Sequence, residues 1–263
     1  MNILFRMEKG IAVCLFSSFF VLACVSHIPG EKAAVSNGDI PLKFTADIHE
    51  ATYTRVAGNG FEENDEVGVF ALVGSSTMKE ERYADNLRFF RTSEKVFESS
   101  EPIYYPDDEV TLRLISYYPY QEEGVNMGES TMSVAVETDQ NLSAGYFCSD
   151  FLVASQNLQS APKGAIALHY DHKFFKLKIA LVGKEGEELQ GILDADPKLS
   201  VCGFYTKAIY DFQKETYSAF SNEKSITPAG KWEIQGDRLS GKEVILIPQE
   251  TTLGYQYIVL DVG

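Results

Sequence analysis

The stretch Ile40–Arg55 has the sequence IPLKFTADIHEATYTR and the clearest strand pattern of this chain. Apolar and polar side chains alternate along its first half. The apolar set is Leu42, Phe44, Ala46 and Ile48. A period of two places these side chains on one face of an extended chain, so the stretch predicts a β-strand with one apolar face. Arg55 then ends a polar run ahead of a glycine-containing segment, which predicts a loop that carries a lone basic residue.

Similar strand patterns follow along the rest of the chain. Val67–Val73 is a nearly continuous apolar run, and alternating patterns recur at Val110–Tyr118 and Phe175–Leu181. Turn residues separate such segments at intervals of roughly 8–15 residues, a spacing typical of antiparallel sandwiches. We find no convincing long amphipathic helix pattern. The chain is therefore predicted to be all-β, with a domain boundary in the polar stretch Gln156–Gly164.

Composition limits the classes of protein to consider. The chain has 263 residues, of which 44% are hydrophobic and 12% aromatic, which suffices for a sizeable core. Its formal net charge is −15. Such an acidic surface repels nucleic acid and anionic lipid, so no nucleic-acid partner is expected.

The amino terminus resembles an export signal. Arg6 and Lys9 precede Ile11–Leu22, an apolar run shorter than the roughly 20 residues that span a bilayer. Val21-Leu22-Ala23-Cys24 then resembles a bacterial lipobox, in which the cysteine is acylated and becomes the new amino terminus. We expect residues 1–23 to be a lipoprotein signal peptide, Cys24 the lipidation site and 24–39 a tether. The alternative is an ordinary signal peptide with an incidental cysteine.

Two further cysteines, Cys148 and Cys202, lie in the body of the chain. They could pair in an exported protein, but two cysteines do not make a disulfide framework. Each lies close to a phenylalanine, so buried free thiols are the other interpretation.

Motifs of chemistry are scarce. His169, Asp171 and His172 resemble metal ligands, but on a strand His172 points away from the other two. No other residues have zinc spacing, so we predict no metal, no cofactor and no catalytic residue. Acidic runs such as Asp107–Glu109 are interpreted as solvated loops. A hydrolase would need two of these carboxylates to converge in a cleft.

A set of short segments, in order, resembles the fimbrillin family of Bacteroidota surface lipoproteins, the pilins of type V pili. The matching segments are Ile40–Ile48 with Thr54-Arg55, Asn64–Phe70, Tyr104-Tyr105-Pro106, Ser116–Tyr120, Ser149–Ala154, Leu168–Leu177 and Ile247-Pro248-Gln249.

The resemblance implies a fold and an assembly mechanism. It implies two tandem antiparallel β-sandwich domains of transthyretin-like type, here at 40–160 and 161–263, and a non-enzymatic structural or accessory pilus subunit. It implies export to the outer membrane as an acylated precursor and cleavage by a trypsin-like surface protease between Arg55 and Val56. The strand holding Leu42–Ile48 would then leave, and a strand of another pilus subunit would fill its place by β-augmentation.

Three departures from the family pattern keep other roles open. Phe61 stands where tryptophan is common, and Asn64 stands where glycine is common. The sequence also ends soon after Gln249, so we expect an incomplete C-terminal domain, which argues against a shaft role and leaves a tip, accessory or non-polymerising role open. The alternative is a monomeric outer-membrane lipoprotein that binds a host or dietary glycan or protein. Tyrosines at 104, 105, 117, 118 and 120 could stack on sugar rings, although such residues more often cover a sheet.

Overall fold

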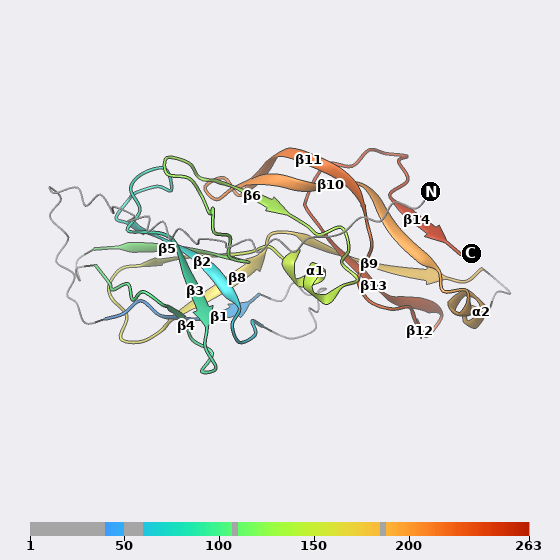
Figure 1. Ribbon diagram of the computed structural model, residues 1–263, viewed down its shortest axis with the longest axis horizontal. Coiled ribbons are helices and arrows are strands. Elements are labelled where there is room, and N and C mark those ends of the chain that lie inside the picture. The colour runs from blue at the N-terminus through green and yellow to red at the C-terminus, as the bar shows by residue number, and fades with distance from the viewer. Residues whose placement is uncertain (1–39, 50–59, 107–109, 185–187, 263) are drawn as a thin grey trace, which may run out of the picture. The chain divides into compact units, whose positions relative to one another are not determined.

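The computed structural model describes residues 40–49, 60–106, 110–184 and 188–262. Over these ranges the chain forms fourteen strands and two six-residue helices (Figure 1). The prediction of an all-β chain is therefore confirmed. In the described ranges we find no helix with the length and hydrophobicity needed to span a membrane.

Seven strands close into a barrel in the order β1-β4-β3-β2-β5-β7-β8. Their bounds are β1 Phe44–Ile48, β2 Glu66–Val73, β3 Ala84–Arg91, β4 Phe97–Ser99, β5 Leu112–Tyr118, β7 Leu152–Leu158 and β8 Ile166–His172. Every neighbouring pair is antiparallel except β1 and β8, which are parallel. The barrel differs from the predicted sandwich, because β1 joins β4 to β8 and closes the sheet on itself.

The other strands form two smaller sheets. One has the order β11-β10-β14, with β6 also paired to β10, and the other has the order β12-β13-β9. The bounds are β6 Thr131–Ala135, β9 Phe175–Val182, β10 Lys198–Asp211, β11 Thr216–Ile226, β12 Glu233–Gln235, β13 Arg238–Leu246 and β14 Ile258–Asp261. The helices are α1 Ser143–Cys148 and α2 Leu189–Asp194.

Two hydrophobic cores explain the apolar run in β2. Val67, Val69 and Ala71 belong to the core built from barrel strands. Phe70 and Leu72 belong to a second core, shared with β10 and β13. Both faces of β2 are therefore covered by side chains, and a strand buried on both faces needs no polar alternation.

The predicted domain boundary falls between two strands of one sheet. β7 ends at Leu158 and β8 begins at Ile166, and both belong to the barrel. All described residues lie within one compact unit, Ala34–Gly263. A division at residue 160 therefore stays a prediction.

Four elements do not follow directly from the sequence pattern. The polar pair Thr206-Lys207 favours a break between Leu199–Tyr205 and Ala208–Phe212, but β10 runs through both segments. The buried Thr206 hydroxyl donates to the carbonyl oxygen of Asn222 at 2.7 Å, so a polar residue is satisfied inside the sheet. The prediction also missed β11, whose residues are mostly exposed and polar, and both short helices.

Candidate functional site at the first strand

Strand β1 is held unequally by its two neighbours (Figure 1). It pairs with β8 along its whole length, from Phe44 opposite Ile166 to Ile48 opposite Tyr170. On its other side it pairs with β4 only where Phe44 faces Phe97. The barrel therefore closes through one short contact, which is its narrowest hydrogen-bonded junction.

The inward face of β1 fills the barrel core. Phe44 is fully buried and stacks on Phe97, with ring centroids 5.0 Å apart, and Leu42 just ahead of the strand is 4% exposed. Ala46 and Ile48 pack against the same core, while Thr45 lies on the exposed face. The predicted alternation is confirmed. Burying a side chain such as Phe44 contributes about 1.5–3 kcal/mol.

Backbone hydrogen bonds fix the segment ahead of β1. The Leu42 amide donates to the Ile103 carbonyl at 2.8 Å, and the Tyr105 amide donates to the Ile40 carbonyl at 3.0 Å. On the opposite side the Ile166 amide donates to the Lys43 carbonyl at 2.9 Å. Loss of this segment would leave each of these groups without its present partner.

The outward face of β1 carries an ionisable cluster. His169 Nδ1 lies 2.6 Å from Asp47 Oδ1, and His49 Nδ1 lies 2.9 Å from Asp171 Oδ1. The two imidazole rings stack with centroids 5.4 Å apart and 7° between their planes. One ligand atom from each of Asp47, His49 and His169 lies within 4.8 Å of the others.

The strand pattern predicts that His169 and Asp171 share one face, as they do in the structure, but it does not predict their partners Asp47 and His49. Asp47 and His169 are 122 positions apart in the sequence, so no local spacing links them. The available signal was the spacing, because Asp47 and His49, like His169 and Asp171, lie two residues apart and so share one face of an extended chain.

His172 lies on the face of β8 opposite to His169 and Asp171, as predicted. Its Nδ1 atom is 2.7 Å from Asp150 Oδ1, and both side chains are largely buried.

Other predicted residues fall outside the described ranges or have another environment. Cys24, Arg55 and Val56 lie outside the described residues. Cys148 and Cys202 are free thiols, as one of the two interpretations has it, but Cys148 is exposed and Cys202 is only partly buried.

The tyrosines considered as sugar-binding residues mostly cover the cores. Tyr105 and Tyr117 are buried, and Tyr118 and Tyr120 are partly buried. Tyr104 is 36% exposed. The aromatic loops therefore offer little ring surface to a ligand.

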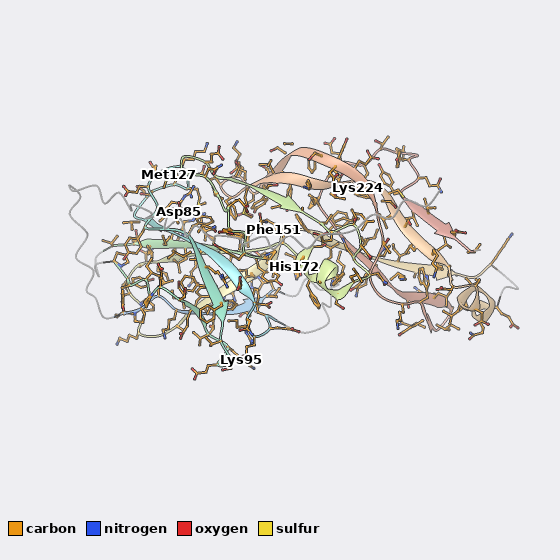
Figure 2. The ribbon with its side chains drawn as sticks, in the orientation of Figure 1. Asp85, Lys95, Met127, Phe151, His172 and Lys224 are labelled. Atoms are coloured by element: carbon orange, nitrogen blue, oxygen red, sulfur yellow. The ribbon has the colours of Figure 1, made fainter. Side chains whose placement is uncertain are left out.

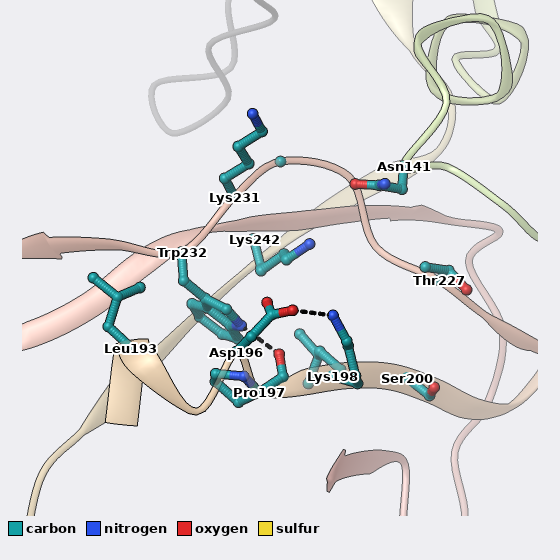
Figure 3. A pocket seen from close by; sticks show the side chains of 12 residues that line it. Asn141, Leu193, Asp196, Pro197, Lys198, Ser200, Thr227, Lys231, Trp232 and Lys242 are labelled. Carbon is teal, nitrogen blue, oxygen red and sulfur yellow. Dashed lines mark hydrogen bonds and ion pairs between the residues drawn. The ribbon is translucent and has the colours of Figure 1, made fainter. Parts of the chain in front are cut away.

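A cavity of about 610 Å³ lies beside the only tryptophan of the chain (Figure 3). The Trp232 indole Nε1 donates to the Pro197 carbonyl at 2.9 Å, and Lys198 forms an ion pair with Asp196. Burial lowers the pKa of Lys242, which lines the same cavity. The other lining residues are Asn141, Leu193, Leu199, Ser200, Thr227, Gly230 and Lys231.

Strand β14 presents an apolar edge. It pairs with β10 and with no other described strand, and its four residues are all exposed. Leu260 and Val262 line a groove of about 730 Å³ with Leu181 of β9 and Ile192 of α2. Unpaired edges of this kind can accept a further strand.

Solved structures with related folds come from the genus Bacteroides. A protein named as a cell adhesion protein from Bacteroides ovatus aligns with a TM-score of 0.57 at 16% identity, over 81% of this chain and 79% of that one. Another, from Bacteroides uniformis, aligns with a TM-score of 0.55 at 19% identity, over 84% and 78%. At these identities the likeness concerns the fold.

A curated relative is named as a fimbrium subunit, Fim1C, of Bacteroides uniformis. The two sequences are 23% identical over 214 residues, which cover 78% of this chain and 65% of that protein. The chain thus spans less than two thirds of the relative's length.

A family model described as fimbrillin-like matches residues 54–263, which include every described strand except β1. That match covers most of the chain and agrees with the resemblance found in the short sequence motifs. The chain therefore belongs to the fimbrillin-like family.

Proposed function

We propose that this chain is a structural or accessory subunit of a cell-surface fimbria that assembles by strand exchange. It is exported to the outer membrane as a precursor acylated at Cys24. A trypsin-like surface protease cuts between Arg55 and Val56, which frees the lipid anchor and lets β1 leave. A strand of a second subunit then takes its place.

The main support for this proposal is the position of β1 between β4 and β8 in the barrel. β1 joins β4 to β8, so its departure would open the barrel and leave backbone groups of β8 without partners. It would also empty the fully buried site of Phe44. Unpaired buried donors and acceptors cost roughly 1–3 kcal/mol each, which favours the entry of a replacement strand.

Phe61, the second described residue after the proposed cut, is well anchored. Phe61 is 7% exposed and makes edge-on ring contacts with Phe97 of β4 and Tyr170 of β8, at centroid distances of 5.2 and 5.0 Å. After cleavage at Arg55, the contacts of Phe61 with both strands that flank β1 would remain. The apolar edge of β14 offers a further surface for a neighbouring subunit.

The amino terminus and intact mass of the protein, taken from the surface of its own cells, test the proposal. We expect a chain that starts at Val56, carries no lipid and is present in surface polymer. A chain that starts at acylated Cys24 and carries β1 would contradict assembly through loss of that strand.

The second candidate function is that of a monomeric surface lipoprotein that binds a glycan or protein. The cavity beside Trp232 favours it, because Lys198, Lys231 and Lys242 are among the residues that line it, and within the described ranges only Lys198 of these three forms an ion pair there, with Asp196. That arrangement suits an anionic sugar. Since Trp232 is the only tryptophan, its fluorescence should report titration with acidic oligosaccharides.

The lysines supply a matched pair of variants for this test. Saturable quenching that Lys242→Met abolishes would support ligand binding. Lys224→Met, on the exposed surface of β11, is the control and should leave the titration unchanged (Figure 2). Absence of saturable quenching, or equal binding by both variants, would reject this cavity as the site.

A further inference from the structure

The outward faces of β1 and β8 bring together two aspartates and two histidines. The parallel register sets Asp47 opposite His169, and the next outward position on each strand holds His49 and Asp171. Each acidic residue thus faces a histidine across the strand pair, and the two histidines lie on a diagonal. All four side chains are exposed, with relative accessibilities between 53% and 64%.

The hydrogen bonds orient both imidazole rings. Asp47 lies 2.6 Å from Nδ1 of His169, and Asp171 lies 2.9 Å from Nδ1 of His49. At His169, Nδ1 already faces the Asp47 oxygen, so an ion bound by both residues would take the place of the proton between them. At His49, the Asp171 carboxylate at Nδ1 favours the proton on that nitrogen, so Nε2 has the free lone pair. Metal-binding histidines commonly have this carboxylate–imidazole arrangement, in which the acid fixes the ring and raises its basicity.

The separations are compatible with a metal centre after small side-chain rotations. One ligand atom from each of Asp47, His49 and His169 already lies within 4.8 Å of the others. A tetrahedral zinc ion with bonds of about 2.0–2.1 Å holds its ligand atoms roughly 3.3 Å apart. Because the three side chains are exposed, they can close this gap without moving the strands.

We propose that Asp47, His49 and His169 form a site for a divalent transition-metal ion of the zinc class, with Asp171 orienting His49. Imidazole and carboxylate ligands suit zinc, nickel and copper, whereas calcium and magnesium prefer sites made of oxygen ligands alone. Asp47 and His49 come from the β1 segment, and His169 comes from β8. The bound ion therefore clamps the first strand to its neighbour.

The bound ion would also slow the release of β1 during assembly, and this step rests on the proposed function. If β1 must leave after cleavage, an ion shared between β1 and β8 has to dissociate first. Metal then slows strand release, and its removal speeds it. The metal site itself needs no cleavage, so it can be tested on the uncut chain.

Zinc titration of the purified full chain, with a chromogenic chelator as competitor, tests the site. We expect one equivalent of zinc, with affinity at least tenfold weaker in His49→Gln and in His169→Gln, and no competition by calcium or magnesium. His172→Gln is the control, because that residue lies on the other face of β8 and can keep a hydrogen bond to Asp150. No saturable binding, or equal affinity in all variants, would overturn the proposal.

Release of β1 tests the clamp. The chain is cut with trypsin, and separation of the amino-terminal fragment is followed by size-exclusion chromatography in zinc or in EDTA. Zinc should slow release at least tenfold in the wild-type chain and should have no effect in His49→Gln. Equal rates of release in zinc and in EDTA would overturn the clamp.

If trypsin leaves the Arg55 bond intact, that result counts against the proposed function alone, since zinc binding is measured on the uncut chain.

Discussion

The ring of Phe44 lies almost parallel to the ring of Phe97, with 5.0 Å between the centroids and 6° between the planes. These two residues also face each other in the β1–β4 ladder. One pair thus joins the first strand to β4 through both the backbone and the core. The predictions on strand exchange follow from this contact and from the longer contact with β8.

Phe44→Ala should lower the free energy of unfolding by about 3–5 kcal/mol, because it removes a buried ring and leaves a cavity at the barrel closure. Urea denaturation measures the change. Phe175→Ala is the matched control, since Phe175 is 40% exposed, and it should cost much less. Equal losses in the two variants would mean that the Phe44 site is not part of a well-packed core.

Arg55→Ala should abolish the cut chain and reduce surface polymer, because a trypsin-like protease requires a basic residue before the bond. Arg238→Ala is the control, since Arg238 is an exposed arginine at the start of β13. Immunoblots of surface fractions from both strains measure the result. Unchanged polymer in the Arg55→Ala strain would refute assembly through this cleavage.

A disulfide between β1 and β8 should retain the strand after cleavage. Thr45 and Ala167 are register partners on the exposed face, and adjacent strands lie about 4.8 Å apart, within the span of a disulfide. The double variant Thr45→Cys, Ala167→Cys should be cut normally, stay unassembled when oxidised and assemble after reduction. The single variant Thr45→Cys should assemble in both conditions. Assembly of the oxidised double variant would show that β1 need not leave.

Tyr105→Phe should raise the free energy of unfolding by about 1 kcal/mol. The Tyr105 side chain is buried, and its hydroxyl makes no hydrogen bond to any other residue in the described ranges. An unpaired buried hydroxyl carries a desolvation cost that phenylalanine does not. Tyr255→Phe, at a half-exposed site, should change stability by no more than about 0.5 kcal/mol. A destabilised Tyr105→Phe variant would mean that this hydroxyl has a partner.

The same tyrosine should make stability depend on alkaline pH. Burial raises the pKa of Tyr105 from 10.0 to about 12. Between these values the unfolded chain loses a proton that the folded chain keeps, so this contribution to stability is complete below pH 10 and is lost as pH rises toward 12. Denaturation midpoints measured across this range should fall more steeply in the wild type than in Tyr105→Phe. Identical slopes would contradict the raised pKa.

Several strands could be predicted from the sequence because their patterns are local. Alternation along Leu42–Ile48 and the apolar run of Val67–Val73 each require only neighbouring residues, and both correspond to strands. Strand β11 could not be predicted in this way. Its residues are mostly exposed, and it is extended because it pairs with β10.

The sequence by itself determined the all-β class, the apolar face of β1 and the resemblance to fimbrillins. The tertiary structure decided that β1 runs parallel to β8, that the barrel closes through Phe44 and Phe97, and that Asp47 and His49 lie beside His169. The physical reason is distance along the chain. A period-two pattern shows which way each side chain faces, but only the pairing of strands more than a hundred residues apart sets which side chains become neighbours.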